Sequence, residues 1–282
     1  MRNEINQRFI HFLYKNHHEE WVPTPFPADA IKWLKDLLEY LFPNTFLPNI
    51  SLYEGLLKKN QIDIENILLS YLNHKNFEIE KTVDDFYASL EQIYINLRND
   101  AEATVNSDPA ATSIHEVIVS YPGFFATAVY RIAHKLANLG VPILPRILCE
   151  YAHANTGIDI HPNAVIGVPF VIDHGTGVVI GETSIIGNNV TIYQGVTLGA
   201  LHVEKGLSDT KRHPTVGDNV IIYARTTILG GNTVIGDNYI IGGSVFLTKS
   251  IEANSNVFNT HQLRISSKDR KVQDYDLTIQ AS

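Results

Sequence analysis

The 282-residue sequence contains only one cysteine, Cys149. A single cysteine excludes a disulfide framework within the chain and any metal site built from several cysteines. We expect Cys149 to be a buried structural thiol rather than a catalytic nucleophile.

Positive charge and long apolar segments are also scarce. The 22 Lys and Arg residues are outnumbered by 30 Asp and Glu residues, so the net charge is −8. This balance argues against a general nucleic-acid-binding protein, because phosphate neutralisation needs clustered Lys and Arg. No apolar run approaches the roughly 20 residues that span a bilayer, and residues 1–6 are polar where a signal peptide has an apolar core. We therefore expect a cytoplasmic protein that binds neither nucleic acid nor membrane.

The sequence pattern changes near residue 157. Before this point apolar residues recur at helical spacing, for example within residues 33–41 and 64–72. Further helices are expected over residues 82–106, 124–138 and 144–154. The pattern predicts a helical N-terminal domain over residues 1–156 and says little about its function.

From Ile160 onward an aliphatic residue returns every six positions. The repeat positions are Ile160, Ile166, Ile172, Val178, Val190, Val196, Val216, Ile222, Ile228, Val234 and Ile240, with Ser184 as the exception and Phe246 at the end. A six-residue period is typical of a parallel β-helix whose coil has three sides, with Gly, Asn or Asp at the corners. We predict an α+β protein with a β-helix over residues 157–250 and a C-terminal tail over 251–282. A sandwich of short strands is the alternative.

Residues 202–215 break the repeat. We expect them to form a loop thrown out of the coil, and a loop of this length is uncommon unless it is functional or disordered. It ends in Lys211-Arg212-His213. A guanidinium and an imidazole side by side suit the binding of a substrate carboxylate, although a plain solvated loop is the other interpretation.

Asp173-His174 follows Ile172 where a regular repeat would carry Gly and a small residue. Histidine is the side chain most easily used as a general base near neutral pH, and a carboxylate can orient it. Asp159 precedes His174 by 15 residues, three short of an 18-residue coil, so it is expected on the adjacent rung near the same corner. A simple corner hydrogen bond is the alternative role for this histidine.

A metal site is a rival use of the histidines. His161, His174, His202 and His213 all lie in or around the predicted β-helix, and a β-helix hydratase could bind zinc through three histidines. Zinc sites usually contain a close histidine pair, whereas no two histidines within residues 157–282 are fewer than 11 positions apart. We therefore predict no metal.

Several motifs occur together and in order over about residues 100–250. They are residues 108–110, 121–124, 130–134, 157–162, 172–183, 194–199 and 212–214. This set resembles the serine O-acetyltransferase family, a group within the hexapeptide-repeat acyltransferases. The resemblance implies a helical N-terminal domain followed by a left-handed parallel β-helix.

The resemblance also implies an activity, the transfer of acetyl from acetyl-CoA to the hydroxyl of L-serine. The product, O-acetyl-L-serine, feeds cysteine biosynthesis. In such enzymes the histidine that matches His174 removes the hydroxyl proton and the aspartate that matches Asp159 orients it. No covalent enzyme intermediate is required, which agrees with an inert Cys149.

The same resemblance assigns the two sides of the serine site. The acids that match Asp108 and Asp173 hold the ammonium group, and Arg212 and His213 match the residues that hold the carboxylate. Serine is a zwitterion, so its site needs one acidic and one basic side.

For the co-substrate, the resemblance places Ala200, Ala224 and Gly242 along the pantetheine groove of acetyl-CoA, where small residues let the ligand approach backbone amides. In the family this groove lies between neighbouring subunits of a trimer. Trimers often pair into hexamers through the helical domains, so the resemblance makes residues 1–156 the expected assembly domain. A homotrimer or a dimer of trimers is therefore expected, with L-cysteine as a feedback inhibitor at the serine site.

The sequence departs from the family at two places, one within the β-helix and one after its last coils. Residues 200–205 replace a glycine-rich segment, and residues 257–261 replace a turn rich in small residues. The candidates left for binding the CoA phosphates are Lys249, Arg264 and Lys268.

The C-terminal tail is a further departure. The family tail that docks on cysteine synthase ends in Ile, whereas here Ile279 is followed by three more residues. Cysteine synthase is therefore only a candidate partner.

Three other functions compete with serine acetylation. They are an O-acetyltransferase acting on homoserine or a sugar, a zinc-dependent β-helix hydratase, and a β-helix scaffold without catalysis. Asp108 and Arg212 argue against a sugar, which has no ammonium or carboxylate for them to bind.

Overall fold

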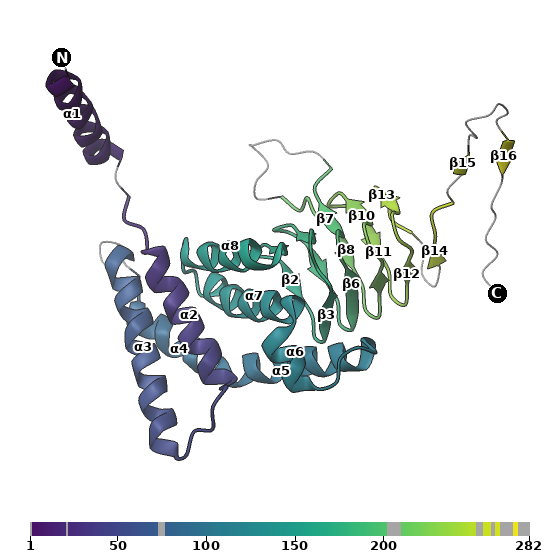
Figure 1. Cartoon of the computed structure of the whole chain (residues 1–282), viewed down its shortest axis with the longest axis horizontal. Helices are drawn as coiled ribbons and strands as arrows, with labels where there is room; N and C mark the ends of the chain where they lie inside the picture. The colour runs from purple at the N-terminus through teal and green to yellow at the C-terminus, as the bar shows by residue number, and fades with distance from the viewer. Residues whose placement is uncertain are drawn as a thin grey trace.

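The computed structural model describes residues 2–20, 22–72, 77–201, 210–251, 256–260, 263–265 and 273–275. The first part of the chain is helical and the second is a coil of short parallel strands (Figure 1). The helices are α1 (Arg2–Glu20), α2 (Pro27–Leu41), α3 (Ile50–Leu72), α4 (Ile79–Tyr87), α5 (Leu90–Ser107), α6 (Ile114–Ser120), α7 (Pro122–Asn138) and α8 (Leu144–Thr156). Among the described residues, no helix is long and apolar enough to cross a membrane.

Helices α2 to α8 share one apolar core, whereas α1 stands apart from it (Figure 1). In α2 the stripe at helical spacing buries Trp33, Leu34 and Leu37 as expected. The single helix expected over residues 82–106 is instead two helices, because the chain breaks between α4 and α5. Ser89 hydrogen-bonds the carbonyl of Phe86 with its hydroxyl at 2.6 Å, and this local bond competes with a continuous helix.

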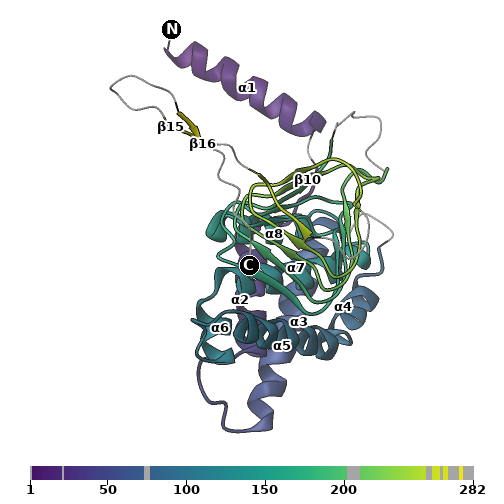
Figure 2. The same ribbon diagram turned by 90° about the vertical axis from the view of Figure 1, so that its right-hand side faces the viewer.

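The coil is a three-sided parallel β-helix, as predicted, and in Figure 2 its turns lie one behind another. Sheet A contains β1 (Asp159–Ile160), β4 (Val179–Ile180), β7 (Thr197–Gly199), β10 (Thr227–Leu229) and β13 (Phe246–Leu247). Sheet B contains β2 (Val165–Ile166), β5 (Ile185–Ile186), β8 (Thr215–Val216) and β11 (Val234–Ile235). Sheet C contains β3 (Phe170–Asp173), β6 (Val190–Tyr193), β9 (Ile221–Ile222), β12 (Ile240–Ile241) and β14 (Asn256–Val257). A separate hairpin pairs β15 (Leu263–Ile265) with β16 (Gln273–Tyr275).

Two corners of the coil carry most of the site residues predicted from the sequence. The CA corner, where the chain passes from sheet C to sheet A, comprises residues 174–178, 194–196, 223–226 and 242–245. The AB corner, between sheets A and B, comprises residues 161–164, 181–184, 200–214 and 230–233. The long loop after β7 therefore leaves from the AB corner, and its residues 202–209 lie outside the described part of the chain.

The register of the repeat differs from the predicted one at two places. Ile172 pairs with Ile192, and Ile160 pairs with Ile180, so the side from 172 to 180 spans eight positions instead of six. From there the stacked positions are 180, 186, 192 and 198, two residues after the predicted 178, 184, 190 and 196. The predicted residues are nevertheless buried, because each side of the coil also turns a second residue inward.

A second shift occurs near Gly230 and Gly231, where the side from Ile228 to Ile235 spans seven positions. The predicted Val234 and Phe246 therefore point outward, with exposed fractions of 44% and 66%. Their neighbours Ile235 and Val245 are buried in their place. Extra residues at corners move the register without ending the coil.

A buried ion pair fastens the helices to the coil. Arg131 of α7 donates two hydrogen bonds to Asp100 of α5, at 2.6 and 2.8 Å. Asp100 also accepts from the backbone of Phe170 in β3 at 2.8 Å, and Arg131 donates to the carbonyl of Gly167 at 3.0 Å. Nearby, a Cβ added at Gly123 in α7 would lie 2.1 Å from the Ile172 carbonyl oxygen, so α7 packs directly on β3.

Candidate active site

Asp173 and His174 lie at the CA corner, in the side of the coil that has two extra residues. His174 has a φ of 57°, in the left-handed region that non-glycine residues rarely adopt. Its Nδ1 is 3.4 Å from Oδ1 of Asp173, and the imidazole side chain is 71% exposed. Strained residues of this kind cluster at functional sites, and the exposed imidazole of a single chain is accessible to a substrate.

The structure brings Asp108 to this corner. Asp108 caps the end of α5, and its carboxylate accepts from the hydroxyl of Tyr121 at 2.7 Å and from the backbone of Ala110 at 2.8 Å. The Tyr121 and Ala110 hydrogen bonds, helped by His174, lower the pKa of Asp108. The hydrogen bond to Asp108 in turn raises the pKa of Tyr121 to about 12. Asp108 and Asp173 together make an acidic patch that suits an ammonium group.

Asp159 begins β1 at the same corner, one coil before Val179. Its carboxylate lies beside α8, where Glu150, His153 and Asp159 each place a ligand atom within 4.8 Å of the others. Within the described ranges, no hydrogen bond or ion pair joins Asp159 to His174, so the expected dyad stays a prediction. The three residues could hold a metal ion, although Glu150 already pairs with Arg146.

Arg212 lies at the AB corner with a carboxylate partner. Its guanidinium forms a close ion pair with Glu182, which also accepts from the Asn163 side chain at 3.1 Å. Burial by itself would raise the pKa of Glu182, but the hydrogen bonds from Arg212 and Asn163 outweigh it and lower the pKa. Glu182 thus holds the guanidinium in one place while staying ionised.

His213 is the buried member of this corner. The backbone N–H of Thr183 donates to its Nδ1 at 3.1 Å, so this nitrogen is unprotonated and the neutral ring carries its proton on Nε2. Burial, followed by the charges of Arg212 and Lys211, lowers the pKa of His213 to about 4. The ring lies on Gly181, where a Cβ would come within 2.0 Å of it. His213 is therefore a neutral hydrogen-bond donor over the usual pH range.

The predicted site residues form two groups at different corners. The acidic half-site comprises Asp108, Asp173 and His174 at the CA corner. The basic half-site comprises Arg212 and His213 at the AB corner. Within one chain a side of the coil separates them, and no hydrogen bond or ion pair joins the two groups among the described residues. One chain therefore presents the predicted site residues in two separate groups.

The predicted groove residues divide in the same way. Ala224 and Gly242 follow β9 and β12 at the CA corner, whereas Ala200 follows β7 at the AB corner. The exposed Lys249 follows β13 on the AB side of sheet A. The side chain of Arg264 and the whole of Lys268 lie outside the described residues.

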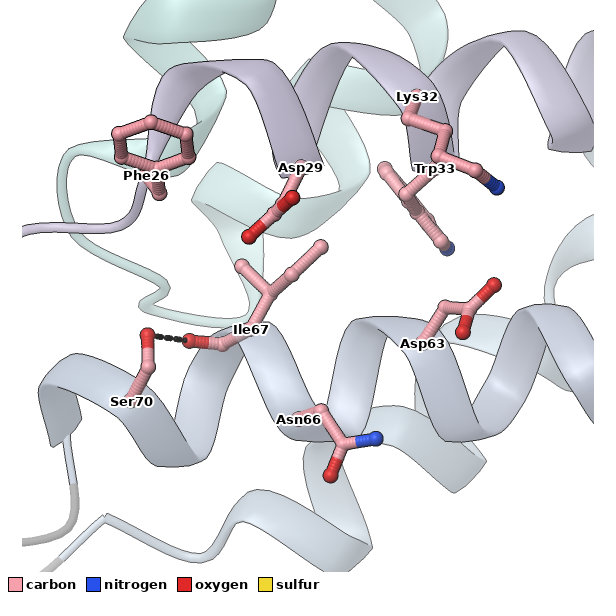
Figure 3. Close-up of a pocket in the computed structure, with 8 residues that line it drawn as sticks. All are labelled: Phe26, Asp29, Lys32, Trp33, Asp63, Asn66, Ile67 and Ser70. Carbon is pink, nitrogen blue, oxygen red and sulfur yellow. Dashed lines mark hydrogen bonds between the residues drawn. The ribbon is translucent and has the colours of Figure 1, made fainter.

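Other candidate groups lie elsewhere. Cys149 is buried, and burial raises its pKa to about 12, so it stays a thiol at neutral pH. A hollow between α2 and α3 is drawn in Figure 3. It is lined by Phe26, Asp29, Lys32, Trp33, Asp63, Asn66, Ile67 and Ser70. None of these eight residues is a predicted site residue.

Tyr121 and Glu182, which bind the side chains of Asp108 and Arg212, have no role that the sequence predicts. Tyr121 belongs to the motif at residues 121–124, but the motif does not indicate a contact with Asp108. Glu182 precedes Arg212 by 30 residues, the length of one coil plus the intervening loop, and this spacing becomes informative only when the loop length is known.

The sequence is similar to known serine acetyltransferases. The sequence model described as "Serine acetyltransferase, N-terminal" matches residues 61–128. The serine acetyltransferase of Bacillus subtilis is 48% identical over 151 residues, which cover 54% of this chain and 68% of that protein. The plasmid serine acetyltransferase of Synechococcus elongatus is 49% identical over 175 residues, which cover 60% of this chain and 54% of that protein. The matches thus span about half to two thirds of these relatives.

Among solved structures, serine acetyltransferase isoform 3 from Entamoeba histolytica, in complex with cysteine, superposes with a TM-score of 0.75 at 36% identity. The superposition covers 88% of this chain and 86% of that one. It therefore includes both the helical part and the coil.

Proposed function

The chain belongs to the serine acetyltransferase family, and we propose that it transfers acetyl from acetyl-CoA to the hydroxyl of L-serine, giving O-acetyl-L-serine for cysteine biosynthesis. One observation carries the proposal. The acidic half-site contains a histidine and the basic half-site contains the Arg212 guanidinium held by Glu182, and together they are complementary to a zwitterion that bears a hydroxyl. Neither a sugar nor a neutral alcohol would use both halves.

The chemistry then follows from the residues of the two half-sites. Asp108 and Asp173 bind the serine ammonium, and Arg212 and His213 bind the carboxylate. His174 takes the hydroxyl proton as the serine oxygen attacks the thioester carbonyl of acetyl-CoA. The C–S bond breaks, and the proton passes from the imidazolium to the departing CoA sulfur. No protein nucleophile is needed.

We further propose that the working site lies between two copies of the chain in a homotrimer. The CA corner of one copy would face the AB corner of the next, which unites the acidic and basic half-sites. Ala224 and Gly242 would then line one wall of the acetyl-CoA groove and Ala200 the other. Pairing of trimers, a cytoplasmic location and binding to cysteine synthase stay predictions, and the end of the tail after Tyr275 lies outside the described residues.

L-cysteine is proposed as an inhibitor at the serine site. Cysteine keeps the ammonium and the carboxylate of serine, so the same two half-sites accept it. The relative from Entamoeba histolytica was solved in complex with cysteine. Inhibition competitive with L-serine is the expected kinetic pattern.

The direct test of this function is the release of CoA from acetyl-CoA, followed with L-serine, L-homoserine and an amino sugar as acceptors. We expect release to depend on L-serine and to be much slower with the other two. A well-folded preparation that releases no thiol with L-serine would contradict the proposal, and a faster reaction with homoserine would change the acceptor.

His174 is tested by substitution. We expect His174→Ala to lower kcat by about 10²- to 10⁴-fold, the usual effect of losing a general base. The matched control is His11→Ala, an exposed histidine on the separate helix α1, which should keep wild-type kcat. An unchanged kcat in His174→Ala would mean that another group is the base.

A further inference from the structure

Arg225 occupies a place in the coil that favours glycine. Successive backbone hydrogen bonds put Gly177, Gly195, Arg225 and Ser244 in one column along the CA corner. All four have a left-handed backbone, with φ values of 80°, 71°, 62° and 58°. The first two are glycines, for which this conformation is unstrained. Arginine there is an outlier, and such outliers point to function when the surrounding fold maintains them.

Arg225 packs directly on the preceding member of this column. Its Cγ is 3.3 Å, and its Cα 3.5 Å, from the point where a Cβ on Gly195 would stand. The residue is exposed, and within the described part of the chain no hydrogen bond or ion pair involves its guanidinium. A charged group at a strained position, without a carboxylate partner, is arranged for an external anion.

Arg225 is also the only lysine or arginine at the CA corner. Asp108 and Asp173 make the beginning of this corner acidic, whereas Arg225 lies two coils further on. At the usual spacing of parallel strands, about 4.8 Å, this is roughly 10 Å along the axis from His174. Of the groove residues expected on this corner, Ala224 precedes Arg225 in the chain and Gly242 lies on the next coil.

We propose that Arg225 binds the phosphate groups of acetyl-CoA. The inference rests on the proposed function, which puts the thioester at His174 and the pantetheine arm along the same corner. The phosphates are separated from the thioester by that arm, so a cation displaced along the axis is in the required direction. Arg225 would supply, from the CA side of the groove, a phosphate contact that Lys249 could complement from the AB side.

The test uses Arg225→Gly, which removes the charge and restores the residue that the backbone favours. Its melting temperature should be no lower than that of the wild type, so misfolding does not confuse the result. We expect the Kd for CoA, measured by calorimetry, and the KM for acetyl-CoA to rise about tenfold, the effect of one lost charge-assisted contact. The kcat and the KM for L-serine should not change. The control is Lys58→Ala, which removes one exposed positive charge in α3 and should change nothing.

A donor without phosphates identifies the group that Arg225 contacts. With S-acetyl-pantetheine, Arg225→Gly and the wild type should have the same KM. An equal loss with both donors, an unchanged Kd for CoA, or a shift confined to the KM for L-serine would each overturn the assignment. A wild type that binds CoA but does not acetylate serine would contradict the proposed function alone, because the Kd for CoA tests Arg225 without an acceptor.

Discussion

At the residue scale, the neutral state of His213 has a consequence for stability. Its pKa falls from 6.5 to about 4 on folding, because burial and two neighbouring cations oppose its protonation. A depressed pKa stabilises the fold fully above pH 6.5, and this contribution is lost as the pH falls from 6.5 toward 4. The unfolded chain binds the proton more readily over that interval.

We therefore expect the melting temperature of the wild type to fall more steeply between pH 7 and pH 4.5 than that of His213→Gln. Glutamine keeps an acceptor for the N–H of Thr183 but does not titrate. His134 and His161, whose pKa values are also lowered by burial, are present in both proteins, so their own titration contributes to both sets of melting temperatures. If the melting temperatures of the two proteins fall in parallel as the pH is lowered, His213 is not the group that causes the loss of stability.

Also at this scale, Asp173 and His174 could be predicted as site residues from the sequence because they interrupt the six-residue repeat. The structure explains the interruption: two extra residues widen this side of the coil and put His174 in a left-handed backbone. The partners of Asp108 and Arg212 could not be foreseen in the same way. Tyr121, at the junction of α6 and α7, reaches Asp108 through the packing of these two helices against α5, a tertiary contact without a periodic signal.

At the scale of elements, the six-residue period predicted the β-helix, but not its register. The coil turns two residues of each side inward, and both can be aliphatic, so Val178 and Ile180 fit the pattern equally well. Only the pairing of strands decides between them. Similarly, helical periodicity continued across Ser89, where a side-chain hydrogen bond ends α4.

The ion pair between Arg131 and Asp100 makes a prediction about how these elements hold together. The two side chains are only 6% and 2% exposed, and burial raises the pKa of Asp100 against the effect of Arg131. Arg131→Gln would leave a buried carboxylate without its charge partner and should lower the free energy of unfolding by about 3–5 kcal/mol. Urea unfolding measures this change.

The matched control for that experiment is Arg98→Gln, which breaks the solvent-exposed pair with Glu102 on α5. An exposed pair of this kind contributes less than about 1 kcal/mol. Equal effects of the two substitutions would mean that the buried pair does not fasten α5 and α7 to the coil.

At the scale of the whole molecule, the two half-sites are the main fact to explain. The sequence motifs identify the residues of both half-sites. They cannot show that the two groups lie at different corners, because the corner at which a residue lies depends on how many residues each coil contains. The trimer was expected from the family resemblance alone. The geometry of one chain supports it independently: the two half-sites lie at different corners of the coil, and a second copy that contributes one of them would bring both to the same ligand.

A site shared between two copies of the chain predicts complementation between two inactive variants. His174→Ala keeps the basic half-site and Arg212→Ala keeps the acidic one, and each alone should have a greatly reduced kcat/KM for L-serine. When the two are co-expressed in equal amounts, about one quarter of the interfaces combine the intact half of each, so about one quarter of the wild-type kcat/KM should return. The control mixes Arg212→Ala with the double variant His174→Ala/Arg212→Ala, which contains no intact basic half-site and should regain nothing. If mixed trimers form, as shown by differently tagged subunits eluting together, and yet activity does not return, the site lies within one chain and the shared-site proposal is wrong.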